Sequence, residues 1–295
     1  MNRIFILNKP TTFTSQDAVS KLKKILNQKK AGHTGTLDPM ATGVLPILVG
    51  DTTKLSKYLV EHTKTYIATL KLGIATDTGD SEGKTIEEKS VNTDVFETTY
   101  LEKILKEFLG KQLQTPPMYS AIKVNGRKLY EYARNGEEVE IPKREIEIYN
   151  IKLVDFSKEK CEITFEVECS KGTYIRTLCE DIAKMLDTVG YMKSLIRTKV
   201  DKFEIKDAIT FEELELNKTD DKWLNIHSYT MEEVFSNLPK IDLNTRKKEL
   251  FLNGVMLTFR EKAGIYNIYN EGKYLGTGII RNELLKRDII LQEEV

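Results

Sequence analysis

Residues 31–50 read AGHTGTLDPMATGVLPILVG, and the rest of the chain is best interpreted from this stretch. It holds a single acid, Asp38, among four glycines, and Pro39 follows that acid directly. Glycine permits backbone angles that other residues resist, and proline biases the residue before it toward an extended conformation. The apolar run 44–49 has the length of a buried strand. We therefore expect Asp38 to lie on a tight loop that leads into a core strand, where reactive groups are often held.

Local chemistry leaves two interpretations of Asp38 open. Its carboxylate is either a reactive group or the acceptor in an Asx-type turn with Pro39. Because turn aspartates far outnumber catalytic ones, the loop alone does not decide between them.

The composition is that of an ordinary globular protein, with 295 residues, 40% hydrophobic and 31% charged. This length suggests about two domains. No window approaches about 18 apolar residues, and the apolar stretch at the start is too short for a secretory signal, so we expect no membrane span and a cytoplasmic protein. The three cysteines form no CxxC pair and the three histidines (His33, His62, His227) show no ligand spacing, so we expect neither a disulfide nor a metal site.

Charge is unevenly distributed along a chain whose net charge is zero. Bases exceed acids in residues 1–57, 120–134 and 191–206, and in the second segment they alternate with Tyr130 and Tyr132. The third segment carries Lys193, Arg197, Lys199, Lys202 and Lys206. Such patches could form an RNA footprint if the fold brings them together, and solvated faces are the alternative.

Periodicity and capping patterns predict an α+β chain. The expected elements, in order, are a strand at 3–7, a helix started by the capping box 14–17, a strand at 65–72, a helix at 101–108 closed by Gly110, strands at 145–153 and 161–169, a helix started by the box 177–180, and two short helices started by the boxes 210–213 and 230–233. Tyr66 is then either a core residue or a ring presented at a strand end. Arg176 precedes a predicted helix start, where it could bind an anion or form a structural salt bridge.

Two further segments affect the domain organisation. The segment from Gln114 to about Pro142 is basic, rich in tyrosine and typical of an insertion. Pro239 marks a boundary, after which short strands and turn glycines predict a small β-rich module.

A serine-hydrolase interpretation rests on residues 79–83, which match the pattern G-x-S-x-G with Ser81 at its centre. That nucleophile elbow requires a strand before it and a helix after it. Residues 84–89 contain one apolar residue, so the required helix is not predicted and we disfavour this function.

Six blocks of sequence, in order, resemble the TruB-type tRNA pseudouridine-55 synthases. They are Asn8-Lys9-Pro10, Gly32 to Gly43 (GHTGTLDPMATG), Lys64-Thr65-Tyr66, Thr76 to Gly83 (TDTGDSEG), Pro117 to Lys123 (PMYSAIK) and Ser170 to Arg176 (SKGTYIR). The second block is highly specific, and this favours the reactive role for Asp38. Two departures from the family pattern are Asn8, where Asp is more usual, and Asp201, where a Gly usually follows the Arg-Thr block.

The resemblance implies a pseudouridine-synthase core with a mixed, largely antiparallel sheet flanked by helices, plus a small C-terminal β-rich PUA-like barrel. We expect a catalytic domain at 1–238, containing an RNA-gripping insertion at about 112–143, and a PUA-like RNA-binding domain at 239–295.

The activity implied by the resemblance is isomerisation of the uridine at position 55, in the T-loop of tRNA, to pseudouridine, without cofactor or metal. The partner is then the T-arm stem-loop of tRNA, and no protein partner is implied. Breaking and re-forming the glycosidic bond needs an ionised group, and a free carboxylate is ionised at pH 7. Whether it attacks C1′, removes the 2′ proton toward a glycal or adds to C6 is left open.

Roles for individual residues also follow from the resemblance. Asp38 is the expected nucleophile, Arg176 holds it charged and oriented, and Tyr66 stacks on the flipped uracil and assists proton loss at C5. His33 wedges into the T-loop and Leu195 forms the apolar wall of the pocket. The remaining expected contacts to substrate or RNA are Tyr174, Asp80, Lys9, Lys54 and Lys123. The rival hypothesis is an RNA-binding or RNA-folding protein in which Asp38 only shapes a turn.

Overall fold

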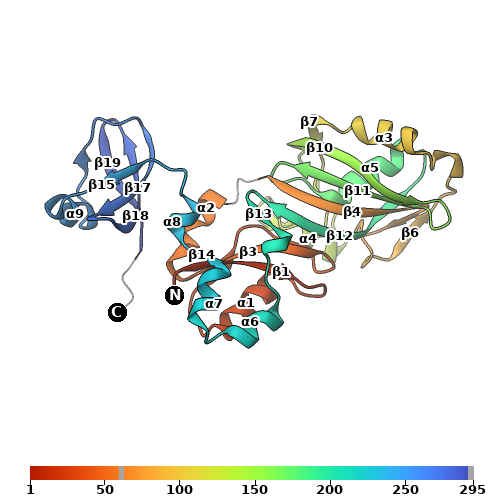
Figure 1. Cartoon of the computed structure of the whole chain (residues 1–295). Coiled ribbons are helices and arrows are strands. Elements are labelled where there is room, and N and C mark those ends of the chain that lie inside the picture. The colour runs from red at the N-terminus through yellow and green to blue at the C-terminus, as the bar shows by residue number, and fades with distance from the viewer. Residues whose placement is uncertain (60–62, 292–295) are drawn as a thin grey trace.

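The computed structural model describes residues 1–59 and 63–291, which form a large sheet with its helices and a separate five-stranded sheet (Figure 1). The N-terminus lies between the two, close to the helices that join them (Figure 1). His62, and the parts of the two predicted domains that fall at 60–62 and 292–295, lie outside the described residues.

The large sheet has ten strands in the part of the chain that is described. Its main path runs β14-β1-β3-β12-β4-β11-β10-β7, with β2 paired to β3 and β13 to β12. Their bounds are β1 (Arg3–Lys9), β2 (Ala31–His33), β3 (Thr42–Val49), β4 (Lys64–Leu72), β7 (Gly110–Gln114), β10 (Arg144–Ser157), β11 (Glu162–Cys169), β12 (Gly190–Val200), β13 (Phe203–Glu204) and β14 (Ser228–Tyr229). All these pairs are antiparallel except β3 with β12, so the predicted mixed, largely antiparallel sheet is confirmed.

Helices flank this sheet, as predicted. The α-helices are α1 (Ser15–Ile25), α2 (Ser56–Leu59), α3 (Thr98–Lys106), α4 (Leu129–Asn135), α5 (Ile175–Met185), α6 (Phe211–Asn217), α7 (Asp221–Ile226), α8 (Met231–Val234) and α9 (Thr245–Leu252), and three 3₁₀ turns are η1 (Gly50–Leu55), η2 (Thr93–Val95) and η3 (Ile205–Asp207). The capping boxes predicted at Thr14, Thr210 and Thr230 are all present. Each threonine accepts a hydrogen bond from a backbone N–H three residues later, which satisfies a donor that the helix leaves open.

Two predictions of local structure were wrong, and some elements were not predicted. α5 begins at Ile175, before the predicted box at 177–180, so Arg176 lies inside the first turn of the helix. Gly110 does not close α3, which ends at Lys106; it begins β7 with a φ of 91°. β2 and α9 were not predicted.

The apolar run in β3 is explained by burial on both faces of its strand. Leu45 and Ile47 pack into the main core, together with α1 and the long strands. Val44 and Leu48 point the other way, into a second core. A strand covered on both sides lacks the polar alternation of a half-exposed one.

The C-terminal sheet has the order β15-β17-β18-β19-β16 and a core of its own. Its strands are β15 (Lys240–Asp242), β16 (Leu257–Thr258), β17 (Gly264–Asn270), β18 (Lys273–Arg281) and β19 (Leu284–Ile290). This curled sheet is consistent with the predicted PUA-like module, although its β15–β17 pair is parallel.

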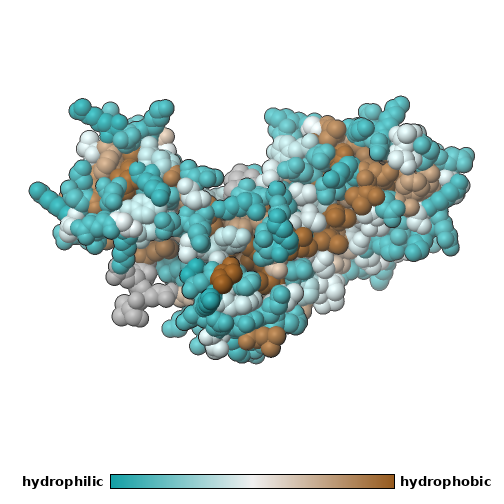
Figure 2. Space-filling view, in the orientation of Figure 1, coloured by the Kyte–Doolittle hydropathy of each residue, from teal (hydrophilic) through white to brown (hydrophobic). Residues whose placement is uncertain are grey.

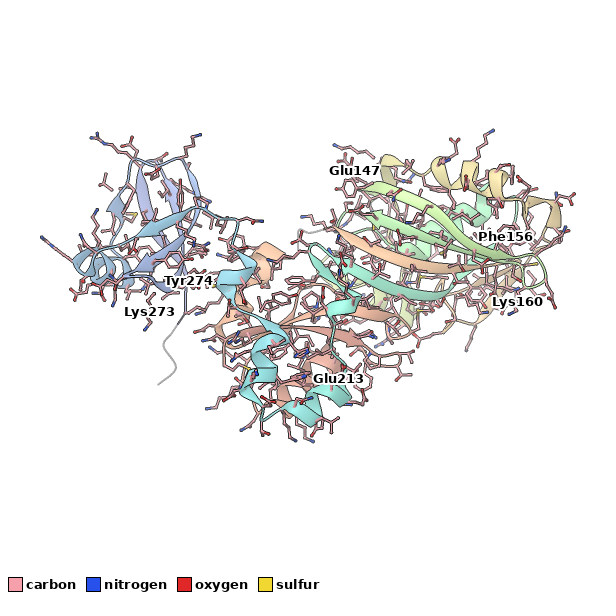
Figure 3. The ribbon with its side chains drawn as sticks, in the orientation of Figure 1. Glu147, Phe156, Lys160, Glu213, Lys273 and Tyr274 are labelled. Carbon is pink, nitrogen blue, oxygen red and sulfur yellow. The ribbon has the colours of Figure 1, made fainter. Side chains whose placement is uncertain are left out.

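The two sheets are packed against each other through the second core. Ile289 of β19 is buried there with residues of β1 and β3, and Tyr274, labelled in Figure 3, packs beside it. The carboxylate of Asp288 accepts hydrogen bonds from Lys57 and from Tyr58 of α2, the latter at 2.6 Å. Apolar residues form an uneven band over the large sheet in Figure 2, whereas hydrophilic residues cover most of the visible small sheet.

Two short hairpins complete the fold, β5 (Ile74–Thr76) with β6 (Thr85–Glu88) and β8 (Lys123–Val124) with β9 (Arg127–Lys128). All three cysteines are free, as expected. β6 follows the turn that contains the exposed Ser81, so the helix required by a nucleophile elbow is absent there.

Candidate active site

A cavity of about 360 Å³ lies where the loop before β3 meets β4, β12 and the first turn of α5. Its walls come from five segments far apart in sequence: residues 34–38, residues 64 and 66, residues 119–121 with Tyr130, residues 170–176, and residues 192, 195 and 197. This volume falls within the usual range for pockets that bind small ligands, about 300–1,000 Å³. The cavity therefore brings together four of the predicted blocks of sequence.

Asp38 and Arg176 form a two-point ion pair at this cavity. The Arg176 Nε lies 3.1 Å from Asp38 Oδ2, and Arg176 Nη2 donates to Asp38 Oδ1 at 3.3 Å. The Arg176 side chain is 6% exposed, whereas that of Asp38 is 30% exposed. Such a two-point pair fixes the plane of the carboxylate while one side of it stays open to the cavity.

Arg176 is itself held by three further groups. Its Nη1 donates to Thr78 O and its Nη2 to Tyr119 O, both at 3.0 Å. Asp80 Oδ2 lies 3.6 Å from Nη1. Asp80 is 4% exposed and does not line the cavity, so the expected substrate contact does not fit its position, because its carboxylate faces Arg176.

Burial raises the pKa of Asp38 above its ordinary value. The Arg176 charge opposes this shift, Asp80 adds to it and Lys9 opposes it. An ion pair favours the charged form, but removal from water disfavours it, and here the second effect is larger. Arg176 thus orients the carboxylate and limits a shift that burial would make larger.

Tyr66 lies on β4, is 7% exposed and contributes its side chain to the cavity wall. Both predicted alternatives therefore apply, because the ring is buried and also faces the site. Burial raises its pKa to about 12, with the nearby Arg197 charge opposing the shift. At neutral pH Tyr66 is a protonated phenol and not a ready base.

Leu195 and Tyr174 both line the cavity. Leu195 is an inward-facing residue of β12 and is 6% exposed. Tyr174 is the residue before α5, and its backbone N–H and C=O both bind the side-chain amide of Gln114, at 2.8 and 3.0 Å. Through these two hydrogen bonds, Gln114 fixes the backbone at the start of α5.

His33 ends β2 and does not line the cavity. Its Nδ1 accepts a hydrogen bond from the backbone N–H of Gly35 at 3.3 Å. Burial and the nearby Arg197 charge lower its pKa, so the ring is neutral at pH 7. It is half-buried at the start of the loop that carries Asp38.

Lys9 does not have the solvent-exposed position expected of an RNA contact. It is fully buried, and its Nζ donates to Pro10 O at 2.9 Å, Phe13 O at 2.6 Å and Pro39 O at 3.2 Å. Burial lowers its pKa to about 8. Lys9 thus holds the backbone next to Asp38 through its bond to Pro39 O. Because its side chain is enclosed in protein, a phosphate cannot reach it in this conformation.

Lys54 and Lys123 are both exposed, and they lie in different places. Lys54, on η1, pairs with Asp51 at 2.9 Å and faces a second cavity beside the C-terminal sheet. Lys123 lies on β8, in the predicted insertion. Neither lines the cavity that contains Asp38.

Arg197 is a residue of the site that the sequence reasoning misplaced. It was assigned to a basic surface patch, but its side chain is 0% exposed and lines the cavity. The strand alternation could have revealed this, because Arg197 is two residues from Leu195 and therefore shares its inward face. A count of charges without the strand period places it wrongly in solvent.

Residues 1–59 and 63–291 contain no group of three or more His, Cys, Asp or Glu arranged to hold a metal ion. No helix in the described part of the chain is long and apolar enough to span a membrane.

Family models match most of the chain. Residues 23–175 match the N-terminal domain model of the TruB family pseudouridylate synthases, and residues 176–236 match the C-terminal domain model of tRNA pseudouridylate synthase B. The tRNA pseudouridine synthase B of Bacillus subtilis (strain 168) is 45% identical over 89% of this chain and 85% of its own. That of Francisella tularensis subsp. holarctica (strain FTNF002-00 / FTA) is 39% identical over 99% and 98%.

Solved structures share the fold at lower identity. A chain of a Cbf5-Nop10-Gar1 complex gives a TM-score of 0.70 at 24% identity, covering 99% of this chain and 84% of that one. A chain of an H/ACA RNP bound to a substrate RNA containing 2′-deoxyuridine gives a TM-score of 0.70 at 23% identity, covering 98% and 85%. Because these two matches cover nearly the whole of this chain, both of its sheets have counterparts in those folds.

Proposed function

Since the chain belongs to the TruB family of pseudouridylate synthases, we propose that it converts the uridine at position 55, in the T-loop of tRNA, to pseudouridine. The observation that carries this proposal is an ionisable carboxylate, Asp38, held by Arg176 at a cavity that also presents Tyr66 and Leu195. The relatives named tRNA pseudouridine synthase B support tRNA as the substrate. The reaction is an isomerisation in which the N1–C1′ bond breaks, a C5–C1′ bond forms, C5 loses a proton and N1 gains one.

Asp38 is the proposed nucleophile. Arg176 fixes both carboxylate oxygens, so the reacting oxygen is held at one place relative to the bound nucleotide. Attack at C1′, removal of the 2′ proton and addition to C6 all require the ionised carboxylate close to the sugar and base. All three routes therefore place the same requirement on Asp38.

The uracil ring is proposed to lie between Tyr66 and the apolar wall that Leu195 provides. A buried aromatic ring and an aliphatic side chain suit a flat base, and aromatic stacking adds about 1–3 kcal/mol per base. Because its pKa is about 12, Tyr66 serves as a neutral ring and hydrogen-bonding phenol in the resting enzyme. Tyr174 completes the wall at the start of α5.

Access to the cavity requires the target nucleotide to leave its stack, at a cost of a few kcal/mol. His33 is proposed to fill the vacated space in the T-loop. Its neutral imidazole, at the start of the loop that carries Asp38, supports a role as a stacking wedge better than one as a cation.

Residues outside the cavity are proposed to bind the RNA backbone. The insertion at about 112–143 supplies Lys123 and also contributes Tyr119 and Tyr130 to the cavity wall, so RNA held there would lie beside the site. We assign residues 1–238 to catalysis and 239–295, with the nearby Lys54, to contact with the acceptor end of the tRNA. We propose that this activity, acting on tRNA, takes place in the cytoplasm.

The test is incubation of the protein with an unmodified T-arm hairpin, read by carbodiimide treatment and primer extension. Wild-type protein should give a block at the T-loop uridine, and Asp38→Asn should give none while binding the hairpin with nearly unchanged affinity. Since burial raises the pKa of Asp38, its ionised form does not stabilise the fold, and the variant should melt at or above the wild-type temperature.

The matched control is Asp187→Asn. Asp187 is also paired with a cation, Lys89, but its side chain is 98% exposed and remote from the cavity walls. This variant should be as active as wild type. Turnover by Asp38→Asn would refute the role of Asp38, and an active wild type that modified another uridine would refute the T-loop assignment.

A further inference from the structure

The guanidinium of Arg197 is enclosed in protein at the wall of the cavity. Its side chain is 0% exposed, and it is the largest of the fully buried side chains in the described residues. The catalytic roles proposed above make no use of it. A fully buried cation is costly unless it is well hydrogen-bonded, so its contacts indicate what it does.

Arg197 contacts both ends of the loop that carries Asp38. Its Nη2 donates to Gly35 O at 3.2 Å and its Nη1 to Thr36 O at 3.4 Å, on the N-terminal side of the loop. Its Nε donates to Val44 O at 2.7 Å, in β3, on the C-terminal side. One planar group thus spans the loop and bridges the chain on either side of Asp38.

The backbone of Arg197 fixes the same loop at a second level. β12 pairs with β3 in parallel, with Arg197 opposite Gly43. Gly43 has a φ of 105°, and a Cβ at that position would lie 2.2 Å from Arg197 O. The loop therefore ends in a contact with β12 that only glycine permits.

The same guanidinium also reaches the other side of the cavity. Arg197 lies opposite Tyr66 in the antiparallel β12–β4 register, both residues line the cavity, and the Arg197 charge acts on the Tyr66 phenol by opposing the rise of its pKa. Its N–H groups are thus largely used within the protein, which leaves it poorly suited to bind substrate directly.

We infer that Arg197 is a positioning residue that fixes the loop bearing Asp38 and the hydroxyl of Tyr66 relative to each other. Asp38 lies on the loop that leads into β3, Tyr66 lies on β4, and β12 lies between these two strands. The inference rests on the proposed roles of these two residues and goes beyond them, because it names the group that sets their separation.

Lysine cannot replace arginine in this arrangement. The guanidinium is a rigid fork whose donors point in fixed directions, whereas a lysine ammonium is a point donor on a flexible stem. Arg197→Lys keeps the charge and the apolar stem but can satisfy only part of the set of acceptors. It therefore separates positioning from charge.

The experiment is steady-state kinetics of Arg197→Lys on the T-arm hairpin. We expect kcat to fall about 100-fold, the typical effect of misplacing a reacting group by about 1 Å. KM should stay within about threefold, because the walls that bind the base are retained. In a Tyr66→Phe background the same substitution should cost clearly less, because the hydroxyl that Arg197 is inferred to position is already removed.

Controls separate positioning from general loss of stability. Phe165→Leu weakens the same core from β11 without touching the cavity, and it should lower the melting temperature while leaving kcat within about twofold. Gly43→Ala keeps the arginine but pushes the loop end and the Arg197 backbone apart, and it should reproduce the kcat loss of Arg197→Lys. It serves as the second variant if Arg197→Lys is poorly folded.

Each result has a defined consequence. Wild-type kcat in folded Arg197→Lys, or a loss confined to KM, would overturn the inference. An equal loss with and without the Tyr66 hydroxyl would overturn the link to Tyr66. Failure of the wild type to modify the hairpin would instead refute the proposed function, and this is measured separately in the same series.

Discussion

At the scale of single residues, the reactivity of Asp38 is set by two opposing influences. Burial raises its pKa, and the Arg176 charge beside it opposes that rise. Asp80 acts on the same balance from behind Arg176, where its carboxylate adds to the upward shift. A residue outside the cavity lining can therefore alter how much of the proposed nucleophile is ionised.

This balance predicts the acidic limb of the pH–rate profile. Only the ionised carboxylate reacts, so kcat/KM should fall as the pH is lowered through a pKa above the ordinary 3.8 of an aspartate. Asp80→Asn removes a negative charge near Asp38, so the limb should move to lower pH. Rates on the hairpin between about pH 4 and 8 measure both effects. A limb at or below the ordinary value, or an upward shift in Asp80→Asn, would contradict the prediction.

The residues that could be predicted from the sequence are those whose role depends on chemistry carried in short blocks. Asp38, Arg176, Tyr66 and Leu195 all face one cavity. Lys9 was misplaced because charge alone suggests a surface, whereas three backbone carbonyls here replace water around a buried ammonium. Long-range acceptors of this kind leave no local pattern.

At the scale of elements, some helix starts are fixed by residues nearby in sequence, and one is fixed by a contact with a distant strand. Thr14, Thr210 and Thr230 cap their helices with their own side chains, and those starts were predicted. α5 has no side-chain cap, and Gln114 of β7 binds the backbone of the residue before it, sixty positions away in sequence. The sequence around 177–180 could not show that the start had been moved by a contact with another strand.

Because Gln114 fixes the backbone at the start of α5, replacing it should measurably lower the stability of the protein. Gln114→Leu keeps the side-chain volume but leaves the N–H of Tyr174 without its acceptor, and its C=O keeps only the hydrogen bond from Leu178 N–H; this should cost about 2 kcal/mol. The melting temperature should then drop by roughly 4–8 °C. The matched control is Gln112→Leu on the same strand, where a single bond to Phe108 O is lost and the drop should be clearly smaller. Equal effects of the two substitutions would contradict the special role of Gln114.

At the scale of the whole molecule, the two sheets behave as joined parts. β1 and β3 are buried on one face by the main core and on the other by a core that includes Ile289 of the C-terminal sheet. Asp288, whose side chain is 5% exposed, accepts hydrogen bonds from Lys57, Tyr58 and Thr277. Apolar burial and a satisfied carboxylate thus act together at this junction.

Asp288→Ala should loosen this junction. The substitution leaves the hydroxyls of Tyr58 and Thr277 without their acceptor and should lower the free energy of unfolding by about 2 kcal/mol. This loss is smaller than that for breaking a fully buried ion pair, because Lys57 is half exposed and can be solvated. Urea titration followed by circular dichroism measures the loss. Asp187→Ala, which breaks an exposed pair with Lys89, should cost under about 0.5 kcal/mol. A cost for Asp288→Ala no greater than this would show that the junction relies on apolar contact alone.

The position of β12 has a consequence for how the enzyme comes into being. On the ribosome, β3 and β4 emerge early, but the strand that belongs between them is translated only much later. Until then β4 keeps an unpaired edge, and β3 keeps one at Thr42 and Gly43, beyond the part that β2 covers. A chain that ended before β12 would therefore lack the wall of the pocket that Met192, Leu195 and Arg197 supply.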